Sequence, residues 1–162
     1  MYHLTPETAD DYYEVEALYD LCFAPGREAL SSYRLRDGIR VVAGLSHVAR
    51  DEGGVLAGAI RYWPVKIGQV TGLLLGPVAV HPTRQGEGLG RALIERSLER
   101  GINEGWERVL LVGDAPYYGR FGFSILPNVV MPPPTNPDRV LGRSLVHGAW
   151  DGVAGSVRRC IE

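Results

Sequence analysis

The residues best suited to binding chemistry lie between Leu73 and Gly90, in the segment LLLGPVAVHPTRQGEGLG. A run of branched aliphatic residues gives way there to a polar turn, and alternating glycines at 86, 88 and 90 open an expected helix. Glycines leave successive backbone N–H groups unshielded, and the first N–H groups of a helix form an anion site together with the positive end of its dipole. The segment therefore predicts a site for a phosphorylated ligand.

Two other phosphate-binding motifs fit this segment less well. A dinucleotide fold carries G-x-G-x-x-G directly after a strand, whereas here Arg91 stands where the third glycine belongs and His81 to Gln85 separate the strand from the glycines. Asp114, at the end of the next apolar run, could act as the ribose-binding acid, so this alternative stays open. A P-loop is absent because no Gly-Lys-Ser/Thr follows.

A third motif accounts for more of the chain. The pattern Gln85-x-x-Gly88-x-Gly90 resembles the Q/R-x-x-G-x-G/A turn of the GNAT superfamily of acyl-CoA N-acyltransferases. The resemblance continues upstream in GPVAVHP at 76–82 and downstream in GDAPYYGRFGF at 113–123. The downstream run is similar to a subgroup of small bacterial predicted N-acetyltransferases. Together these stretches lie between Leu73 and Phe123, about a third of the chain, in the order and spacing of the family.

The resemblance implies acetyl-CoA as co-substrate. Its pantetheine arm would bond like an extra strand to the backbone of Val78, Ala79 and Val80, where two parallel strands splay apart. Pro77 supports a break in the ladder there, because proline has no N–H. The four histidines show no ligand spacing such as H-x-x-x-H, so no metal site is predicted. The pyrophosphate would lie on the turn formed by Gln85, Gly86, Glu87, Gly88, Leu89, Gly90 and Arg91.

The resemblance also implies two catalytic roles. Tyr118 would give a proton to the departing CoA thiolate, a reasonable task for a phenol with a pKa of about 10, and Tyr117 is the alternative donor. The N–H of Val78 would polarise the thioester carbonyl. No cysteine lies in the motif region, so we expect a primary amine to attack acetyl-CoA directly in a ternary complex.

One departure from the family concerns the general base. Many relatives carry a glutamate on the strand before the glycine turn, but Thr71 to Val80 contain no acid. An amine with a pKa of about 10.4 is mostly protonated at neutral pH, so something must take its proton. Asp114, Glu28, His47 and a water chain remain open as the acceptor of that proton. The missing glutamate also keeps an alternative function open, a non-catalytic sensor domain that binds acyl-CoA.

The elements that would position these residues indicate one α/β (α+β) domain over 1–162. We expect a mixed, mostly antiparallel central sheet flanked by helices and splayed at the strand that ends near Val80. The expected strands are 2–5, 41–50, 55–63, 71–80, 109–112 and 140–146. The expected helices are one with Thr5 as N-cap that ends before 24–26, a short one ending near Arg36, and one over 88–103.

The acceptor pocket is expected between the segment Ala24 to Arg36, the turn after Val112 and the proline-rich loop 127–138. These segments carry no signature of their own. The acceptor is therefore predicted only as a small-molecule or peptide amine.

Composition limits the remaining function classes. The chain has 162 residues, 45% of them hydrophobic and 22% charged, which is ordinary for one soluble domain. A net charge of −2 without a basic stripe argues against nucleic-acid binding. The N-terminus lacks the features of a signal peptide and no apolar run approaches the length of a membrane span. We expect a cytoplasmic protein with no membrane partner, and a homodimer through a sheet edge is compatible with the sequence.

Overall fold

The computed structural model describes residues 1–23, 27 and 31–161, and the predicted helix break at 24–26 lies outside them. Its helices are α1 (Tyr12–Cys22), α2 (Ser31–Arg34), α3 (Leu89–Asn103) and α4 (Ala115–Gly119), with 3-10 turns at Ala9–Asp11, Pro82–Arg84 and Pro137–Arg139. Its strands are β1 (His3–Pro6), β2 (His47–Arg50), β3 (Leu56–Ile67), β4 (Val70–Val80), β5 (Arg108–Val112), β6 (Ser124–Ile125), β7 (Val129–Val130), β8 (Val140–Ser144) and β9 (Gly155–Arg159).

The sheet is mixed and mostly antiparallel, as predicted. Its main path runs β1-β2-β3-β4-β5-β8-β6, and only the β4–β5 step of that path is parallel. Strand β9 adds to β3 in antiparallel fashion and pairs in parallel with β7. The single parallel step follows from the crossover through α3, which returns the chain to the same side of the sheet in the same direction.

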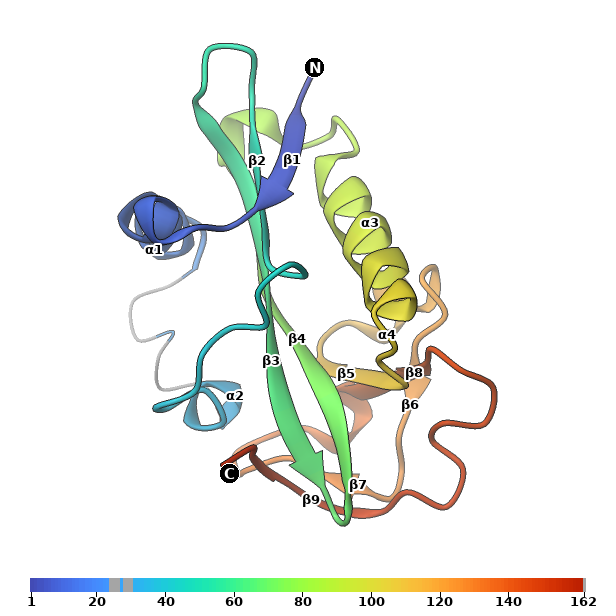
Figure 1. Ribbon diagram of the computed structural model, residues 1–162. Helices are drawn as coiled ribbons and strands as arrows, with labels where there is room; N and C mark the ends of the chain where they lie inside the picture. Colours follow the sequence, from blue (N-terminus) through green and yellow to red (C-terminus); the bar gives the residue numbers. More distant parts are fainter. Residues whose placement is uncertain (24–26, 28–30, 162) are drawn as a thin grey trace.

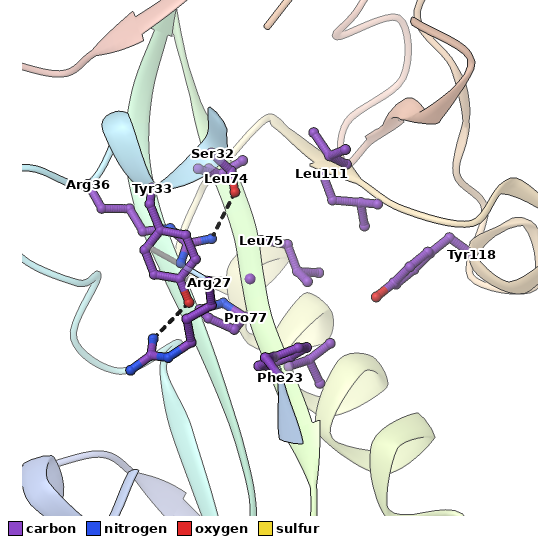
Figure 2. A pocket seen from close by; sticks show the side chains of 13 residues that line it. Phe23, Arg27, Ser32, Tyr33, Arg36, Leu74, Leu75, Pro77, Leu111 and Tyr118 are labelled. Carbon is purple, nitrogen blue, oxygen red and sulfur yellow. Dashed lines mark hydrogen bonds between the residues drawn. The ribbon is translucent and has the colours of Figure 1, made fainter. Parts of the chain in front are cut away.

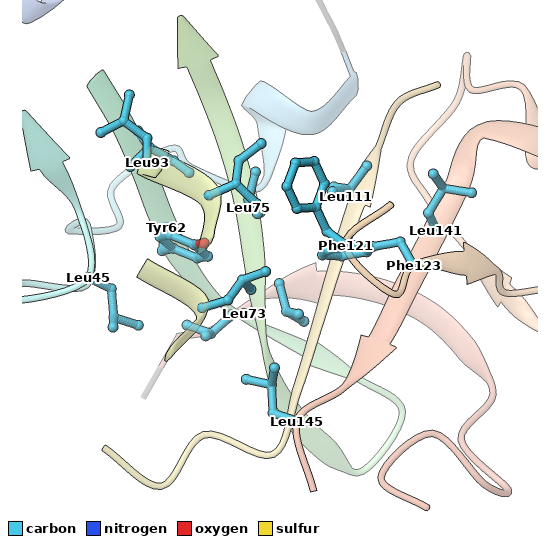
Figure 3. Packing of buried hydrophobic residues seen from close by; sticks show 14 of the residues in the cluster. Leu45, Tyr62, Leu73, Leu75, Leu93, Leu111, Phe121, Phe123, Leu141 and Leu145 are labelled. Atoms are coloured by element: carbon cyan, nitrogen blue, oxygen red, sulfur yellow. The ribbon is translucent and has the colours of Figure 1, made fainter. Parts of the chain in front are cut away.

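Helices cover both faces of this sheet (Figure 1). Helix α1 packs Val15, Leu18 and Tyr19 against one face, as its sequence pattern predicts, whereas Tyr12 from the same pattern stays 49% exposed. Helix α3 covers the opposite face. Its buried side chains join the largest part of the core and include Leu89, Leu93, Ile94 and Leu98. Figure 3 shows part of this core around Tyr62.

The predicted splay lies between β4 and β5. These strands pair only at Leu73 with Val109 and at Leu74 with Leu110. Beyond that point β4 continues to Val80 without a partner strand on this edge. The other edge of β4 is interrupted at the same level. Ile60 of β3 pairs with Val78 and Tyr62 with Leu75, so two residues of β4, Gly76 and Pro77, stand opposite one residue of β3. The expected break in the ladder at Pro77 is confirmed.

The predicted start of the first helix is wrong. Thr5 and Pro6 belong to β1, because the next N–H, that of Glu7, donates to the carbonyl of Ser46 at 2.8 Å and holds the chain against the sheet. Helix α1 follows a 3-10 turn at which the N–H of Thr8 donates to the Asp11 carboxylate at 2.8 Å. A proline after a threonine fits a strand end as well as a helix start.

The strand expected over 41–50 is reduced to β2. Gly44 has a φ of +89°, and the N–H groups of Leu45 and Ser46 donate to the carbonyl of Val42 in a turn. The next strand is longer than expected and passes through Pro64 to Ile67.

Pro64 is tolerated in β3 because of its orientation. The N–H of Tyr62 donates to the hydroxyl of Ser46, and its C=O accepts the N–H of Val42. Both bonds lie on the side of β3 away from β4. Two residues later the backbone faces the same side, so the absent N–H of Pro64 removes no bond to β4.

The C-terminal third holds most of the elements that the sequence did not predict. Strand β8 matches the expected strand but ends at Ser144 rather than 146. Strands β6, β7 and β9 were not expected, and β7 lies inside the segment 127–138 that was predicted to be a loop. Among the described helices, none combines the length and the apolar character needed to cross a bilayer.

Leu110 provides a direct test of this core. It lies in the middle of β5, is fully buried and packs in a group of buried residues that includes Trp63, Leu74 and Val140. Leu110→Ala is expected to lower the free energy of unfolding by about 2–5 kcal/mol, because the cavity cannot close between paired strands. Urea denaturation measures the change. Leu21→Ala, at a 57% exposed position on α1, is the matched control and should cost well under half as much.

Candidate active site

The glycine turn between β4 and α3 presents unpaired backbone donors. Gly86 and Gly88 have φ values of +84° and +78°, which L side chains rarely adopt, and Gly88 is the N-cap of α3. No side chain caps this helix, and its first internal bond runs from the N–H of Ala92 to the carbonyl of Gly88 at 3.1 Å. The N–H groups at 89–91 therefore have no acceptor inside the helix and remain available to an anion where the sequence predicts an anion site.

A groove of about 560 Å³ runs from this turn along β4 to α4. It brings together every predicted cofactor-binding residue except Glu87, whose carboxylate accepts a hydrogen bond from the hydroxyl of Tyr2 instead. Two lining residues were not predicted for this site, Arg84 and Arg120. Arg84 directly precedes the glycine motif and Arg120 lies within the motif at 113–123, so their basic side chains were a signal that could have been used. The groove is lined by Val78, Ala79, Val80, Arg84, Gln85, Gly86, Gly88, Leu89, Gly90, Arg91, Tyr117, Tyr118 and Arg120.

Positive charge borders this groove. Arg84 donates to the carboxylate of Asp51, and Arg91 donates to Glu95 at 3.2 Å. Arg120 lies over the ring of Tyr117, 5.4 Å from its centroid, and has no ion pair within the described part of the chain. A groove with a free guanidinium beside a helix N-terminus suits an anionic ligand.

The exposed edge of β4 offers further backbone donors. The N–H of His81 donates to the carbonyl of Ala57 at 2.8 Å, so this opposite pair is a hydrogen-bonded one. Hydrogen-bonded and non-hydrogen-bonded pairs alternate along an antiparallel ladder. The backbone of Ala79 therefore also bonds to β3, while the N–H groups of Val78 and Val80 face away from β3. Strand β5 no longer pairs with this stretch. The N–H groups of Val78 and Val80 are thus directed toward the splay, as an added strand-like ligand requires.

Tyr118 lies at the far end of the groove, on α4. Asp114 caps this helix by accepting the N–H of Tyr117 at 3.0 Å, and the ring of Tyr118 packs edge-on against that of Tyr117 with centroids 5.0 Å apart. No hydrogen bond joins the Tyr118 hydroxyl to any residue that the structure describes. Burial raises the pKa of Tyr118 to about 12. The group is a neutral phenol with its proton free to donate.

A second cavity, of about 160 Å³, opens on the other side of the splay. Figure 2 shows it between α2, β4 and the end of β5, with the hydroxyl of Tyr118 directed into it. Val78 and Tyr118 line both this cavity and the groove, so the two spaces meet at these residues. The cavity is lined by Phe23, Arg27, Ser32, Tyr33, Arg36, Leu74, Leu75, Gly76, Pro77, Val78, Leu111, Val112 and Tyr118.

Three segments were expected to form the acceptor pocket, and the one before Arg36 contributes several residues to this cavity. Val112 lines the cavity where β5 ends, but the turn after Val112 and the proline-rich loop 127–138 contribute no residue to its described lining. The loop instead supports α2 from outside, where the guanidinium of Arg34 donates to the carbonyl of Pro133 at 2.8 Å.

Neither Asp114 nor His47, the two candidate general bases that the structure describes, lines this cavity. Glu28 lies outside the described residues. Asp114 is exposed and occupied as a helix cap. His47 is buried away from both spaces, with its Nδ1 2.7 Å from the carbonyl of Leu45, and burial lowers its pKa. The cavity's described lining contains no carboxylate and no imidazole.

Gly113 controls the position of Tyr118. A Cβ built on Gly113 would lie 2.5 Å from Cε2 of Tyr118 and 2.9 Å from Cδ1 of Leu111. Gly113→Ala is therefore expected to push the ring aside and to lower kcat about 10- to 100-fold, since small misplacements of a reacting group are costly. Steady-state kinetics measures kcat, and calorimetric titration measures acetyl-CoA binding by the same variant. Gly119→Ala, where a Cβ meets nothing within 4 Å, is the matched control. Equal kcat values for the two variants would contradict the assignment.

Comparison with known proteins gives consistent matches. Residues 43–125 match the family model of an acetyltransferase (GNAT) domain. The uncharacterised N-acetyltransferase YhbS of Escherichia coli K12 is 32% identical over 114 residues, which cover 68% of this chain and 66% of that protein, just under two thirds of its length.

Solved structures agree with these sequence matches. The structure of E. coli YhbS in complex with CoA aligns with a TM-score of 0.84 at 27% identity, covering 98% of this chain and 89% of the other. A GNAT family acetyltransferase from Brucella melitensis in complex with acetyl-CoA aligns with a TM-score of 0.75 at 27% identity, covering 98% of this chain and 95% of the other.

Proposed function

This chain belongs to the GNAT acetyltransferase family, and from that premise we propose that it transfers an acetyl group from acetyl-CoA to a primary amine. The observation that carries the proposal is the meeting of two spaces at Val78 and Tyr118. One space is built for a long anionic ligand, and the other is a small cavity that reaches the same point from the opposite side. A transferase needs such a junction, because donor and acceptor must meet at one atom.

Acetyl-CoA is the co-substrate in this proposal. The pyrophosphate would be held by the N–H groups at 89–91 with Arg120 beside them. The pantetheine arm would follow the free backbone edge at Val78 and Val80. The two solved relatives with CoA or acetyl-CoA bound, both aligned over nearly the whole chain, support this ligand.

The reaction we propose is direct attack in a ternary complex. The amine nitrogen forms a bond to the acetyl carbon while the N–H of Val78 stabilises the charge on the carbonyl oxygen. The carbon–sulfur bond then breaks, and the hydroxyl of Tyr118 gives its proton to the CoA thiolate. The proton lost by the amine passes to water, because the described lining of the cavity offers no carboxylate or imidazole, and solvent returns a proton to the Tyr118 phenolate.

This account predicts a characteristic pH profile. Tyr118 has a pKa near 12, so it keeps its proton throughout the working range and removes no activity as pH rises. The neutral fraction of an amine with a pKa of about 10.4 increases over the same range. We expect kcat/KM for the amine to rise continuously from about pH 7 to about pH 10. Initial rates in buffers of constant ionic strength measure it, and a fall within that interval would contradict an acid that stays protonated up to about pH 10.

An amine screen tests the proposed function. Purified protein is incubated with acetyl-CoA and a panel of primary amines, and released thiol and acetylated product are quantified together. Amine-dependent thiol release with matching product supports the transferase. Saturable acetyl-CoA binding without turnover of any amine would instead support the non-catalytic acyl-CoA sensor.

A further inference from the structure

The guanidinium of Arg36 is half-buried and has few partners. Its Nε and Nη1 atoms are inaccessible and form no hydrogen bond within the described part of the chain. Its Nη2 has one acceptor there, the hydroxyl of Ser32, at a long 3.5 Å. The guanidinium stacks on the ring of Tyr33, 3.9 Å from the centroid, with Trp63 at 5.4 Å. Aromatic faces attract a cation but do not satisfy its donors.

Two neighbouring arginines show what Arg36 lacks. Arg27 donates to Glu16 at 2.8 Å and to Asp20 at 2.9 Å. Arg61 pairs with Glu7 at 2.9 Å and also with Glu16.

These pairings use Glu7, Glu16 and Asp20, and none of the described residues gives Arg36 an ion pair. Burial lowers the pKa of Arg36. A partly desolvated cation to which the described residues offer no counter-ion is unfavourable, and a bound anion would reduce that cost.

Arg36 stands beside the point of acetyl transfer. It lines the acceptor cavity with Val78 and Tyr118 (Figure 2). A Cβ built on Gly76 would lie 3.5 Å from Nη2, so the absence of a side chain at Gly76 leaves room next to this donor. Gly76 is two residues before Val78, which corresponds to about 7 Å along an extended chain. A short molecule can reach both the acetyl carbon and the guanidinium.

We propose that the acceptor amine also carries a carboxylate, which binds the Nη2 edge of Arg36. The carboxylate replaces the long contact to Ser32 and supplies a counter-ion that the described residues do not, in a geometry that suits a planar guanidinium. The small size of the cavity, about 160 Å³, selects short amino acids over bulky anions. This substrate class rests on the proposed function.

Matched substrate pairs test the inference. Amino acids are compared with their carboxamides in the transfer assay, at equal concentrations of neutral amine. Wild-type protein should favour the carboxylate member by at least about tenfold in kcat/KM, as expected for a desolvated charge pair. Arg36→Met should reduce this preference to about one while acetyl-CoA affinity is unchanged, and Arg36→Lys should keep part of it. Arg34→Met, an exposed arginine of α2 outside the cavity, should behave as wild type.

A second readout separates this inference from the proposed function. The indole N–H of Trp63 donates to the carbonyl of Gly76 at 2.7 Å and lies next to Arg36, so its NMR signal reports on the cavity. Titration of CoA-loaded protein with β-alanine should shift this signal saturably in the wild type and not in Arg36→Met, and β-alaninamide should not shift it. The same pattern without acetyl transfer would sustain the carboxylate site and overturn the transferase. Equal behaviour of acid and amide in both readouts overturns the carboxylate site and leaves the transferase intact.

Discussion

Replacing Tyr118 by phenylalanine is expected to lower kcat for acetyl transfer by about 10²- to 10³-fold, the usual contribution of a positioned general acid. The substitution removes one oxygen and keeps the ring that packs against Tyr117, Phe121 and Phe123. Because the hydroxyl makes no hydrogen bond to the described residues, its loss leaves no buried group unpaired. The thiolate then leaves without its proton donor.

Binding measurements distinguish this role from a structural one. Acetyl-CoA affinity by calorimetry and the urea midpoint should both stay near the wild-type values in Tyr118→Phe. Tyr13→Phe, at an 83% exposed position on α1, is the matched control and should retain full kcat. If Tyr118→Phe turns over as fast as Tyr13→Phe, Tyr118 is not the proton donor.

Changing Gly88 to alanine is expected to weaken acetyl-CoA binding at least about tenfold. The side chain meets no atom within 4 Å, so the effect comes from the backbone, whose φ of +78° costs an L residue about 1 kcal/mol or more. Relief of that strain turns the N–H groups at 89–91 away from the position where they bind phosphate. Calorimetric titration with acetyl-CoA gives the change in Kd.

Gly105 supplies a matched control for this variant. It follows α3, has a φ of +91°, and a Cβ there also meets nothing within 4 Å. Gly105→Ala should lower the unfolding midpoint about as much as Gly88→Ala and leave acetyl-CoA binding unchanged. Equal losses of affinity in both variants would mean that stability, and not the phosphate site, accounts for the effect.

The centre of the fold was predictable because its signals are local. The aliphatic run 71–80, the glycines before Leu89 and the apolar run 109–112 define β4, α3 and β5 within one or two residues. The splay was expected from the family resemblance, and β4 does outlast its pairing with β5. The same residues form the groove, so most of the predicted cofactor positions lie together.

The remainder depends on contacts between distant parts of the chain. Strand β9 buries only Val157 and is stabilised by pairing with β3, which no local pattern reveals. Glu87 sits within the predicted motif, yet its side chain bonds to Tyr2 at the other end of the sequence. That Arg36 has no ion pair among the described residues is visible only once Glu7 and the carboxylates of α1 are seen bound to other arginines. Each of these features requires the tertiary structure.

Titration of the purified protein with acetyl-CoA by calorimetry, with NAD and NADP in parallel, tests the central claim most directly. Saturable binding of acetyl-CoA at one site per chain, without binding of either dinucleotide, is the predicted result. Failure to bind acetyl-CoA, or binding of a dinucleotide in its place, would contradict the assignment of the groove on which the proposed function rests.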